Sequence, residues 1–385
     1  MLSAELIDDV SALEPVIPAW EELAAGLGLP MSTPAWMLGW WRHLSPPGAQ
    51  LRVVVVSEAG VVIGVAPFFA VARSRPYARV DYRLLSADDG EGLSPLAAPG
   101  REWDVAPLFA SELADALPRA DLVAFEATPM QSMFPMLFRE NWPGIRRPSP
   151  WRPVVGGATT ISLAHDSLDA WLATRESKLR AEARRRRRRL DEANGSVRWS
   201  TFATLREDLE TMVRLHRSRW EGREQSSFAK NAGGLIDHLH EIGETGCEDG
   251  RLRVQIIEVN GEAISAHVAV AAGGTIVSYN GGWDERHKAL SPPMLRVLAT
   301  VEDGIARKDR YLSLGHGVQS YKQRFADENH PLAWGELIPP GPRSVLAHAG
   351  LARRDIRRSA LQSAKRALND EQVNRLRALR HKWRT

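Results

Sequence analysis

Runs of apolar, largely β-branched residues occupy two separate stretches of the chain, and these runs predict β-strands in both. The first stretch, residues 51–71, is rich in β-branched residues on either side of a turn that contains Gly60. The second stretch, residues 251–280, is interrupted by Asn-Gly at 260–261 and by Gly-Gly at 273–274. Because these dipeptides are typical of tight β-turns, we expect a hairpin in the first stretch and three antiparallel strands in the second.

Apolar residues spaced three or four positions apart predict helices elsewhere. The longest such run extends from Ser167 to Ala193 and ends at Asn-Gly, a dipeptide that commonly stops a helix. Another helix is expected to begin at Ser291, with this residue as its N-cap and Pro292 in its first turn. Further helices are expected at 18–23, from Pro34 through Trp41, at 205–220 and at 292–307, and further strands at 121–126 and 311–314.

The two strand-rich stretches repeat one another at an offset of 201 residues. Both read as a strand, a tight glycine turn and a second strand, so the chain is expected to contain two copies of one α/β unit. Chance similarity between two hairpins is the alternative. The matching residues are Leu51, Arg52, Val53, Gly60 and Ile63 in the first copy and Leu252, Arg253, Val254, Gly261 and Ile264 in the second.

The composition is that of a globular protein long enough for two domains, with 385 residues of which 44% are hydrophobic and 25% charged. Cys247 is the one cysteine, so the sequence predicts no disulfide within the chain and no metal site. The first ten residues contain three acidic and no basic side chains, unlike a secretory signal. Because no apolar run approaches the roughly 18 residues of a membrane span, a cytoplasmic protein is expected.

Positive charge is concentrated in two places, although the whole chain carries a net charge of only +3. Residues 343–385 contain 12 Lys and Arg against 3 Asp and Glu, and six consecutive arginines occupy 184–189. Such clusters favour contact with phosphates or an anionic surface, and a solvated helix face is the equally plain alternative.

The basic C-terminal segment also has apolar residues at helical spacing, from Ile356 to Trp383. An amphipathic basic helix can lie on an anionic membrane, bind nucleic acid or pack on its own protein. Since the rest of the chain is mildly acidic, we expect this tail to dock on the chain itself or on a second subunit, which leaves an oligomer possible.

Several short motifs between residues 165 and 335 resemble those of one enzyme family. In their order and spacing they resemble the CelD-like acetyltransferases of cellulose biosynthesis, also described as BioF2-like, which are GNAT-fold acyltransferases related to the FemAB peptidoglycan aminoacyltransferases. The motifs are Ser177-Lys178-Leu179-Arg180, Leu215-His216-Arg217-Ser218-Arg219-Trp220, the hairpin and strand leading to Tyr279 and Asp284, Ser291-Pro292, and Gly315-x-Gly317-x-x-x-Tyr321-Lys322.

The resemblance implies an α/β fold of tandem GNAT-like domains with mixed, mostly antiparallel sheets. The N-terminal domain would cover 1–160, the acyltransferase domain 161–340 and the basic helical tail 341–385. Three departures from the family pattern stand out: Pro293 replaces a glycine, Ser313 replaces an aspartate, and no clear pyrophosphate loop lies between Asn280 and Met294.

The implied activity is transfer of an acetyl or other acyl group from acyl-CoA to an amine or hydroxyl of a small metabolite or an envelope saccharide precursor. The donor is expected at the helix start formed by Ser291 and Pro292, because free N–H groups at a helix N-terminus attract anions. Two alternatives stay open: an aminoacyl-tRNA-dependent transferase, with tRNA held by the basic residues, and a non-catalytic protein that binds an anionic partner or a membrane surface.

Acyl transfer requires a base or proton relay and a cation or N–H group for the oxyanion. Lys322 is the candidate for the oxyanion or phosphate, Tyr321 for protonation of the leaving thiolate, His216 for a proton relay and Asp284 for the base. A surface lysine, a packing tyrosine, a structural histidine and a turn-capping aspartate are the plainer alternatives. Arg186 is the arginine of its run that is expected to point inward. The candidate substrate-binding and donor-binding residues are Lys178, Arg180, Arg186, Arg219, Trp220, Tyr279, Ser291, Gly315 and Gly317.

Overall fold

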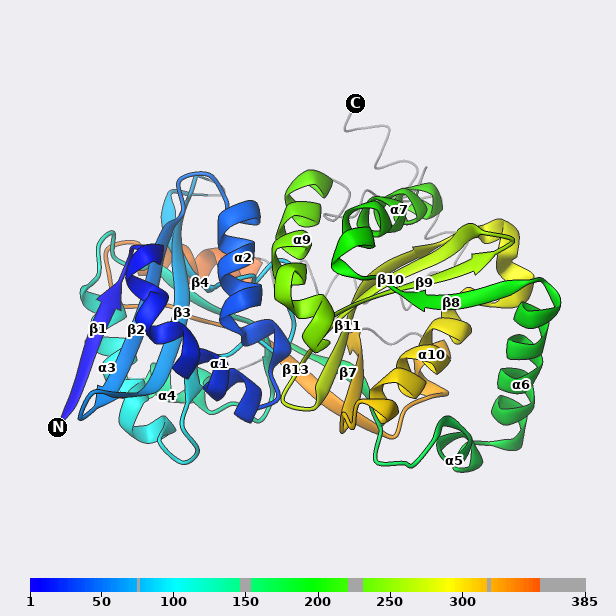
Figure 1. Cartoon of the computed structure of the whole chain (residues 1–385). Helices are drawn as coiled ribbons and strands as arrows, with labels where there is room; N and C mark the ends of the chain where they lie inside the picture. Colours follow the sequence, from blue (N-terminus) through cyan, green and yellow to red (C-terminus); the bar gives the residue numbers. More distant parts are fainter. Residues whose placement is uncertain (75–76, 146–153, 221–230, 317–319, 354–385) are drawn as a thin grey trace.

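The computed structural model describes residues 1–74, 77–145, 154–220, 231–316 and 320–353, apart from the side chains of 154–156, 219–220 and 320–321. The first part of the chain, from β1 to α4, forms what we call the first unit (Figure 1). Its elements are β1 (Leu2–Ile7), η1 (Val10–Val16), α1 (Ile17–Gly26), η2 (Pro30–Ser32), α2 (Pro34–Leu44), β2 (Gln50–Glu58), β3 (Val61–Arg73), β4 (Arg79–Leu84), β5 (Leu96–Ala97), α3 (Glu102–Asp115), β6 (Leu122–Pro129) and α4 (Phe134–Asn141).

The second unit runs from β8 to α11 and has the same succession of principal elements. A strand, two helices, three strands, a helix, a strand and a last helix follow one another in both units. Its elements are β8 (Gly195–Trp199), α7 (Phe202–Trp220), α9 (Ala232–Asp249), β9 (Leu252–Val259), β10 (Glu262–Ala272), β11 (Thr275–Trp283), η3 (Glu285–Leu290), α10 (Pro292–Ala306), β12 (Tyr311–His316) and α11 (Ser320–Gln323).

Two strands outside the units join them into one sheet. β7 (Val154–Ser162) follows the first unit in the chain but pairs with β12 of the second, and β13 (Glu328–Leu337) follows the second unit but pairs with β6 of the first. β7 and β13 also pair with each other. The described residues therefore form a 13-stranded sheet in the order β1-β2-β3-β4-β6-β13-β7-β12-β11-β10-β9-β8, with β5 paired to β3.

The internal repeat predicted from the sequence is confirmed at the level of single residues. Val53 pairs with Pro67 in the first hairpin, and Val254 pairs with Val268 in the second, so both partners keep the 201-residue offset. The register also shifts at the same place, because Ile63 and Ile264 are each left out of the pairing. A conserved bulge position within one chain is strong evidence for two copies of one unit.

The helix expected at 167–193 is two helices, α5 (Leu168–Ala173) and α6 (Ser177–Glu192). The Thr174 hydroxyl donates to the Trp171 carbonyl, and the Arg180 guanidinium donates to the carbonyls of Ala173 and Arg175. These side chains satisfy the carbonyls that the end of α5 leaves unpaired, so the chain turns there. As expected, α6 stops before Asn194, whose φ of 52° is left-handed.

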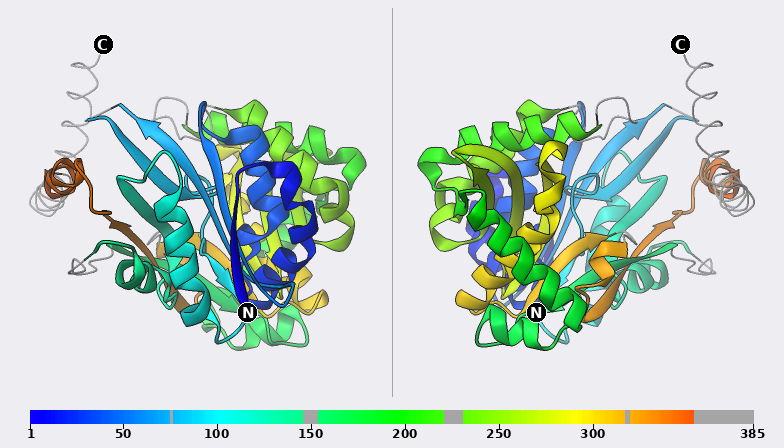
Figure 2. Two further views of the ribbon diagram at one scale, coloured as in Figure 1. Left: turned by 90° about the vertical axis from the view of Figure 1, so that its left-hand side faces the viewer. Right: turned by 90° about the vertical axis from the view of Figure 1, so that its right-hand side faces the viewer.

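Helices cover both faces of the sheet. In the second unit α7 and α9 share one apolar cluster with Val254, Ile256 and Val268, whereas α5, α6 and α10 share another with Ala269 and Ile276. In the first unit α1 and α2 lie on one face and α3 and α4 on the other (Figure 2). α2 also packs on α9, where His43 and Arg42 pair with Glu241 and thereby connect the two units.

The described beginning of the tail, residues 344–353, is helical and packs on the first unit. Ala347 is fully buried, and Arg343 pairs with Asp121 at 3.3 Å. The apolar positions from Ile356 to Trp383 lie outside the described residues. Within the part of the chain that the structure describes, every helix is too short or too polar to cross a membrane.

Candidate active site

The parallel pairing of β11 with β12 is short, and the two strands separate after it. Residues 275–277 pair with residues 311–313, and beyond them β11 carries a bulge at Tyr279 while β12 turns at Gly315, whose φ is 78°. We call the surroundings of Ser278–Gly281 and Ser313–His316 the β11–β12 junction. It interrupts the sheet and therefore frees backbone and side-chain groups to bind a ligand.

A carboxylate from the first unit reaches into this junction. Glu91 accepts hydrogen bonds from the Ser313 hydroxyl at 3.0 Å and from the His316 backbone N–H at 2.9 Å. Its Oε2 also lies 3.2 Å from His316 Nδ1. The Glu91 side chain is 10% exposed and that of His316 is 59% exposed, so a buried carboxylate orients an accessible imidazole. This arrangement fixes Nδ1 as the protonated nitrogen and leaves Nε2 able to accept a proton.

Lys322 is buried at the same junction, as its candidacy requires. Its Nζ donates to the carbonyls of Gly315 and His316, each at 3.2 Å. Burial lowers the pKa of Lys322, and the charge of Glu91 opposes that shift. A Cβ atom placed on Gly315 would lie 3.4 Å from the Ser278 carbonyl oxygen, 3.5 Å from Glu91 Oε2 and 3.8 Å from Lys322 Nζ. The lysine, the glutamate and both strands therefore meet at Gly315.

Tyr279 faces the opposite side of the sheet, toward the first unit. Its ring packs edge-on against Trp36 of α2, with centroids 5.0 Å apart, and Trp36 packs in the same way on His238 of α9. Burial raises the pKa of Tyr279 well above its usual value, and Asp89 adds to the shift. Tyr279 therefore stands at the bulge of the junction with its ring in the contact between the two units, and its role in substrate binding stays a prediction.

The start of α10 differs from the sequence expectation. Ser291 forms no side-chain cap, and Pro292 and Pro293 have no backbone N–H. The N–H groups of Met294 and Leu295 both donate to the Ser291 carbonyl. Because the four N–H groups that a helix end usually offers are absent or used, they do not favour the donor's phosphates here, and the donor's position at this helix start stays a prediction.

His216 and Asp284 each make contacts that hold the fold together, and their expected chemical roles stay predictions. His216 Nδ1 lies 3.3 Å from the Gly281 carbonyl and links α7 to β11. α7 approaches β11 so closely that a Cβ on Gly282 would lie 2.3 Å from the backbone nitrogen of His216. Asp284 caps η3 through the Arg286 backbone N–H and pairs with the Arg286 side chain, which lowers the pKa of Asp284. The turn-capping alternative for Asp284 is the observed one.

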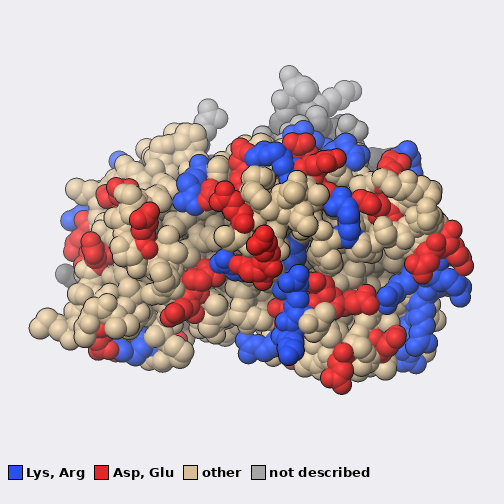
Figure 3. Space-filling view, viewed as in Figure 1, with Lys and Arg blue, Asp and Glu red and all other residues tan. Residues whose placement is uncertain are grey.

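The candidates on α6 lie away from the junction. Arg186 points inward as expected and donates to the Ala289 carbonyl and to Glu182. Arg180 donates to the Arg175 carbonyl just after the end of α5, whereas Lys178 is exposed. Lys and Arg side chains gather over α6 at the right-hand edge of the molecule (Figure 3). Gly317 and the side chains of Arg219, Trp220 and Tyr321 lie outside the described residues.

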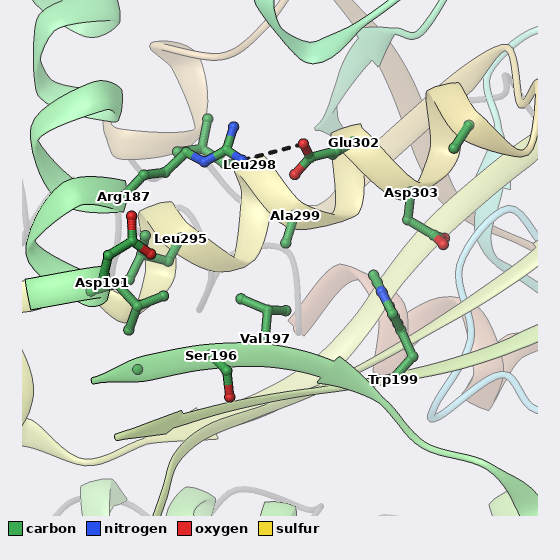
Figure 4. A pocket seen from close by; sticks show the side chains of 13 residues that line it. Arg187, Asp191, Ser196, Val197, Trp199, Leu295, Leu298, Ala299, Glu302 and Asp303 are labelled. Atoms are coloured by element: carbon green, nitrogen blue, oxygen red, sulfur yellow. Dashed lines mark hydrogen bonds and ion pairs between the residues drawn. The ribbon is translucent and has the colours of Figure 1, made fainter. Parts of the chain in front are cut away.

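A cavity of about 380 Å³ lies between α6, β8 and α10 (Figure 4). Leu190, Leu295 and Leu298 form its apolar wall, and the ion pair between Arg187 and Glu302 crosses its rim at 3.3 Å. No residue proposed for catalysis lines it.

Residues 177–323 match the family model for the acetyltransferase (GNAT) domain. The second unit has the GNAT acyltransferase fold. The β11–β12 junction lies within the matched residues, and the internal repeat makes the first unit a second GNAT-like unit. The fold class predicted from the sequence, tandem GNAT-like domains with a mixed sheet, is therefore confirmed, whereas the boundaries at 160 and 340 stay a prediction.

Solved structures share this fold over most of the chain. A structure titled FemX is 10% identical, with a TM-score of 0.57, and the match covers 87% of this chain and 97% of that one. The C-terminal domain of a putative lysylphosphatidylglycerol synthetase from Agrobacterium fabrum is 11% identical, with a TM-score of 0.55 and coverage of 86% and 94%. A conserved protein of unknown function from Bacteroides thetaiotaomicron is 11% identical, with a TM-score of 0.53 and coverage of 87% and 100%. No curated protein matches the chain.

Sequence reasoning missed Glu91 and His316 of the candidate site. His316 stands within the motif that contains Gly315 and Gly317, and a histidine between two glycines after a strand was the available signal. Glu91 lies 225 residues earlier in an acidic loop of the first unit, and no local pattern connects it to His316.

Proposed function

We propose that this protein is an acyltransferase of the CelD-like type. It transfers an acyl group from acyl-CoA to an amine or hydroxyl of a small metabolite or of an envelope saccharide precursor. The observation that carries the proposal is the meeting of Glu91, His316 and Lys322 at the β11–β12 junction of a GNAT unit. These three groups provide an oriented base and a cation, which are the parts that acyl transfer requires.

His316 is the base for the acceptor. The hydrogen bond from Nδ1 to Glu91 holds the ring, and Nε2 takes the proton of the amine or hydroxyl as that group attacks the acyl carbon. Glu91 does not touch the substrate and acts as a positioning residue. Its carboxylate also stabilises the imidazolium while it exists.

Lys322 provides the positive charge for the oxyanion or for a donor phosphate. Its ammonium already faces two carbonyl oxygens in a buried position, so little reorganisation is needed when negative charge develops nearby. Arg296 of α10 lies beside the same site, because its guanidinium would be 3.0 Å from a Cβ on Gly281.

An aminoacyl-tRNA donor is the second candidate, and two observations favour it. The start of α10 lacks the free N–H groups that would bind the pyrophosphate of a coenzyme. Exposed basic residues of α6, among them Arg184, Arg185 and Arg189, would meet the phosphates of a long polyanion instead. Membrane-surface contact through the tail is a further proposal, and liposome co-sedimentation and a tRNA gel shift, each at low and physiological salt, test it.

The test measures transfer of radiolabelled acyl groups from acetyl-CoA and from aminoacyl-tRNA to a panel of amines and amino sugars. His316→Gln should lower turnover about 100-fold or more, the usual contribution of a general base. His330→Gln is the matched control, because His330 forms a similar pair with Glu328 at 2.8 Å on the exposed part of β13. Transfer from aminoacyl-tRNA alone would show that the donor is aminoacyl-tRNA and not acyl-CoA. Absence of transfer from both donors would favour the non-catalytic binding protein.

A further inference from the structure

A small apolar cluster lies in the middle of the sheet, close to the candidate site. Its buried members are Ala127 of β6, Ala158 of β7 and Leu332 of β13. Trp334 of β13 packs on this cluster and remains partly exposed. Since β7 and β13 are the strands that the two units exchange, the cluster forms at the place where the units are joined. We call these four residues the central wall.

The strand register places the central wall on the same face of the sheet as His316. Ala158 pairs directly with His316 of β12, so their side chains point to the same side. Leu332 and Trp334 stand two positions apart on β13 and point to that side as well. The rings of His316 and Trp334 meet edge to face, with centroids 5.7 Å apart and planes inclined by 70°. The indole therefore borders the imidazole that the proposed function uses as a base.

Packing fixes the position of the indole in the central wall. The two alanines are small and leave room for a large ring, and contacts with them and with Leu332 restrict the rotation of that ring. The loop of Glu91 holds the β6 side, because the N–H groups of Gly92 and Leu93 donate to the Ala127 carbonyl. One loop therefore positions the wall through Ala127 and the base through Glu91.

A partly exposed aromatic ring beside a general base suits one class of acceptor. Aromatic side chains that line ligand sites bind flat apolar surfaces and thereby orient the ligand. The C–H face of a sugar ring is such a surface, and the hydroxyl and amino groups of the sugar project from the edge of the ring. A sugar ring on Trp334 would present such a group to Nε2 of His316, the nitrogen that the hydrogen bond to Glu91 leaves free.

A small amine without a ring fits this place less well. An aromatic face attracts an amine in its charged ammonium form, and that form has no lone pair with which to attack the acyl carbon. Lys322 Nζ already donates to the His316 carbonyl at 3.2 Å, and its charge repels a second cation nearby. A contact that holds the uncharged ring of the acceptor leaves the reacting group free, which favours a sugar.

We propose that Trp334 is the platform on which the ring of a saccharide acceptor stacks, so that one hydroxyl or amino group of the sugar reaches His316. The inference rests on the proposed function for the reaction that follows binding, whereas the binding of the sugar needs no donor. Trp334 acts on the choice of acceptor and takes no part in proton transfer. Its loss should therefore change KM for the acceptor more than kcat.

The experiment compares glucosamine and cellobiose with ethanolamine, which offers an amine and a hydroxyl without a ring, as acceptors for the full-length protein. Trp334→Ala should raise KM for the sugars about 10-fold or more and leave KM for ethanolamine unchanged, because only the sugars lose a stacking contact. Trp334→Phe keeps an aromatic ring and should restore most of the difference. Trp103→Ala is the matched control, because Trp103 of α3 is 55% exposed and lies outside the wall. Thermal melts check that each variant is folded.

Calorimetry with the two sugars and no donor separates this inference from the proposed function. Weaker binding to Trp334→Ala than to wild type and Trp103→Ala supports the platform, and if no donor then gives transfer, only the proposed function is overturned. Equal binding to wild type and Trp334→Ala, or no binding to wild type, overturns the platform and leaves the acyltransferase standing. An equal rise in KM for ethanolamine and the sugars also overturns it, because Trp334 would then only support His316.

Discussion

The two units share a succession of elements and a hairpin register, but they differ where their parallel strands separate. In the first unit β4 and β6 pair at residues 81–83 and 122–124. Beyond this point the N–H groups of Gly92 and Leu93 both donate to the Ala127 carbonyl, and Leu93 is fully buried. The first unit therefore fills its own strand junction with backbone and apolar side chains.

Charge reinforces this closure in the first unit. The buried Arg83 pairs with Asp88 and with Glu126, both at 2.7 Å, and so joins the loop after β4 to the neighbouring strand. Burial raises the pKa of Glu126, although Arg83 opposes the shift. In the second unit the equivalent place contains Glu91, His316, Lys322 and Ser278, which are groups able to donate or accept protons.

The difference indicates a division of labour between two copies of one fold. Under the proposed function, the second unit carries out the chemistry at its strand junction, to which the first unit contributes the carboxylate of Glu91. The loop after β4 closes the junction of the first unit through the bond between Arg83 and Asp88. The same loop presents Glu91 to the junction of the second unit, where Glu91 accepts a hydrogen bond from His316.

Replacing Lys322 should have the largest effect among the variants that sharpen this comparison. Lys322→Ala should lower turnover about 100-fold or more, as expected for loss of one group that stabilises an oxyanion. Lys288→Ala, which removes an exposed lysine of η3, is the control and should keep the wild-type rate. Steady-state kinetics measures the turnover of both variants, and thermal melts check that both are folded. Equal rates for the two variants would show that Lys322 is a structural residue.

Glu91→Gln should have a smaller effect, because it weakens the orientation of His316 and keeps the size of the side chain. We expect turnover to fall about 10-fold, in line with loss of a residue that orients another group, with a changed pH profile and little change in KM. Glu328→Gln, at the exposed pair with His330, is the control. A pH profile identical to that of wild type would show that the first unit contributes nothing to catalysis.

The contact between the units predicts an acid-sensitive stability. His238 of α9 packs against Trp36 of α2, and burial lowers the pKa of His238 to about 3, with a further contribution from His43. Between this value and the ordinary 6.5, the unfolded chain binds a proton that the folded chain does not. Stability should therefore fall by about 1.4 kcal/mol for each pH unit as the pH decreases through this range.

Urea unfolding between pH 7 and pH 4 measures this loss. His238→Gln should flatten the dependence on pH, because glutamine does not titrate in this range. Equal slopes for wild type and variant would mean that the histidine is charged or solvated and that the two units are not held together at this contact.

Local signals in the sequence accounted for the hairpins and several helices. Turn residues placed β2 with β3 and β9 with β10, and the repeat predicted that they are equivalent, because tight turns and β-branched runs act over a few residues. The sequence offered no prediction for seven other elements, namely β1, β4, α3, α4, α9, β7 and β13. The exchange of β7 and β13 between the units depends on pairings between residues far apart in the chain, such as Ser162 with Tyr311 and Pro129 with Leu332.

The candidate site was only partly predictable for the same reason. Lys322, Gly315 and Tyr279 were found because they belong to short motifs close to the junction. Asp284 and His216 also stand in motifs, but their hydrogen bonds to Arg286 and to the Gly281 carbonyl could not be predicted from those motifs. Glu91 required the folded arrangement of both units.

Photocrosslinking with a light-activated acyl-CoA analogue, followed by peptide mapping, tests the central claim most directly, since it shows where the acyl donor binds. The account predicts labels on peptides that contain residues 278–281 and 313–322, and their loss when unlabelled acetyl-CoA competes. Labels on residues 81–94 or 122–129 of the first unit would place the donor at the junction that the structure shows to be filled, and would contradict the account.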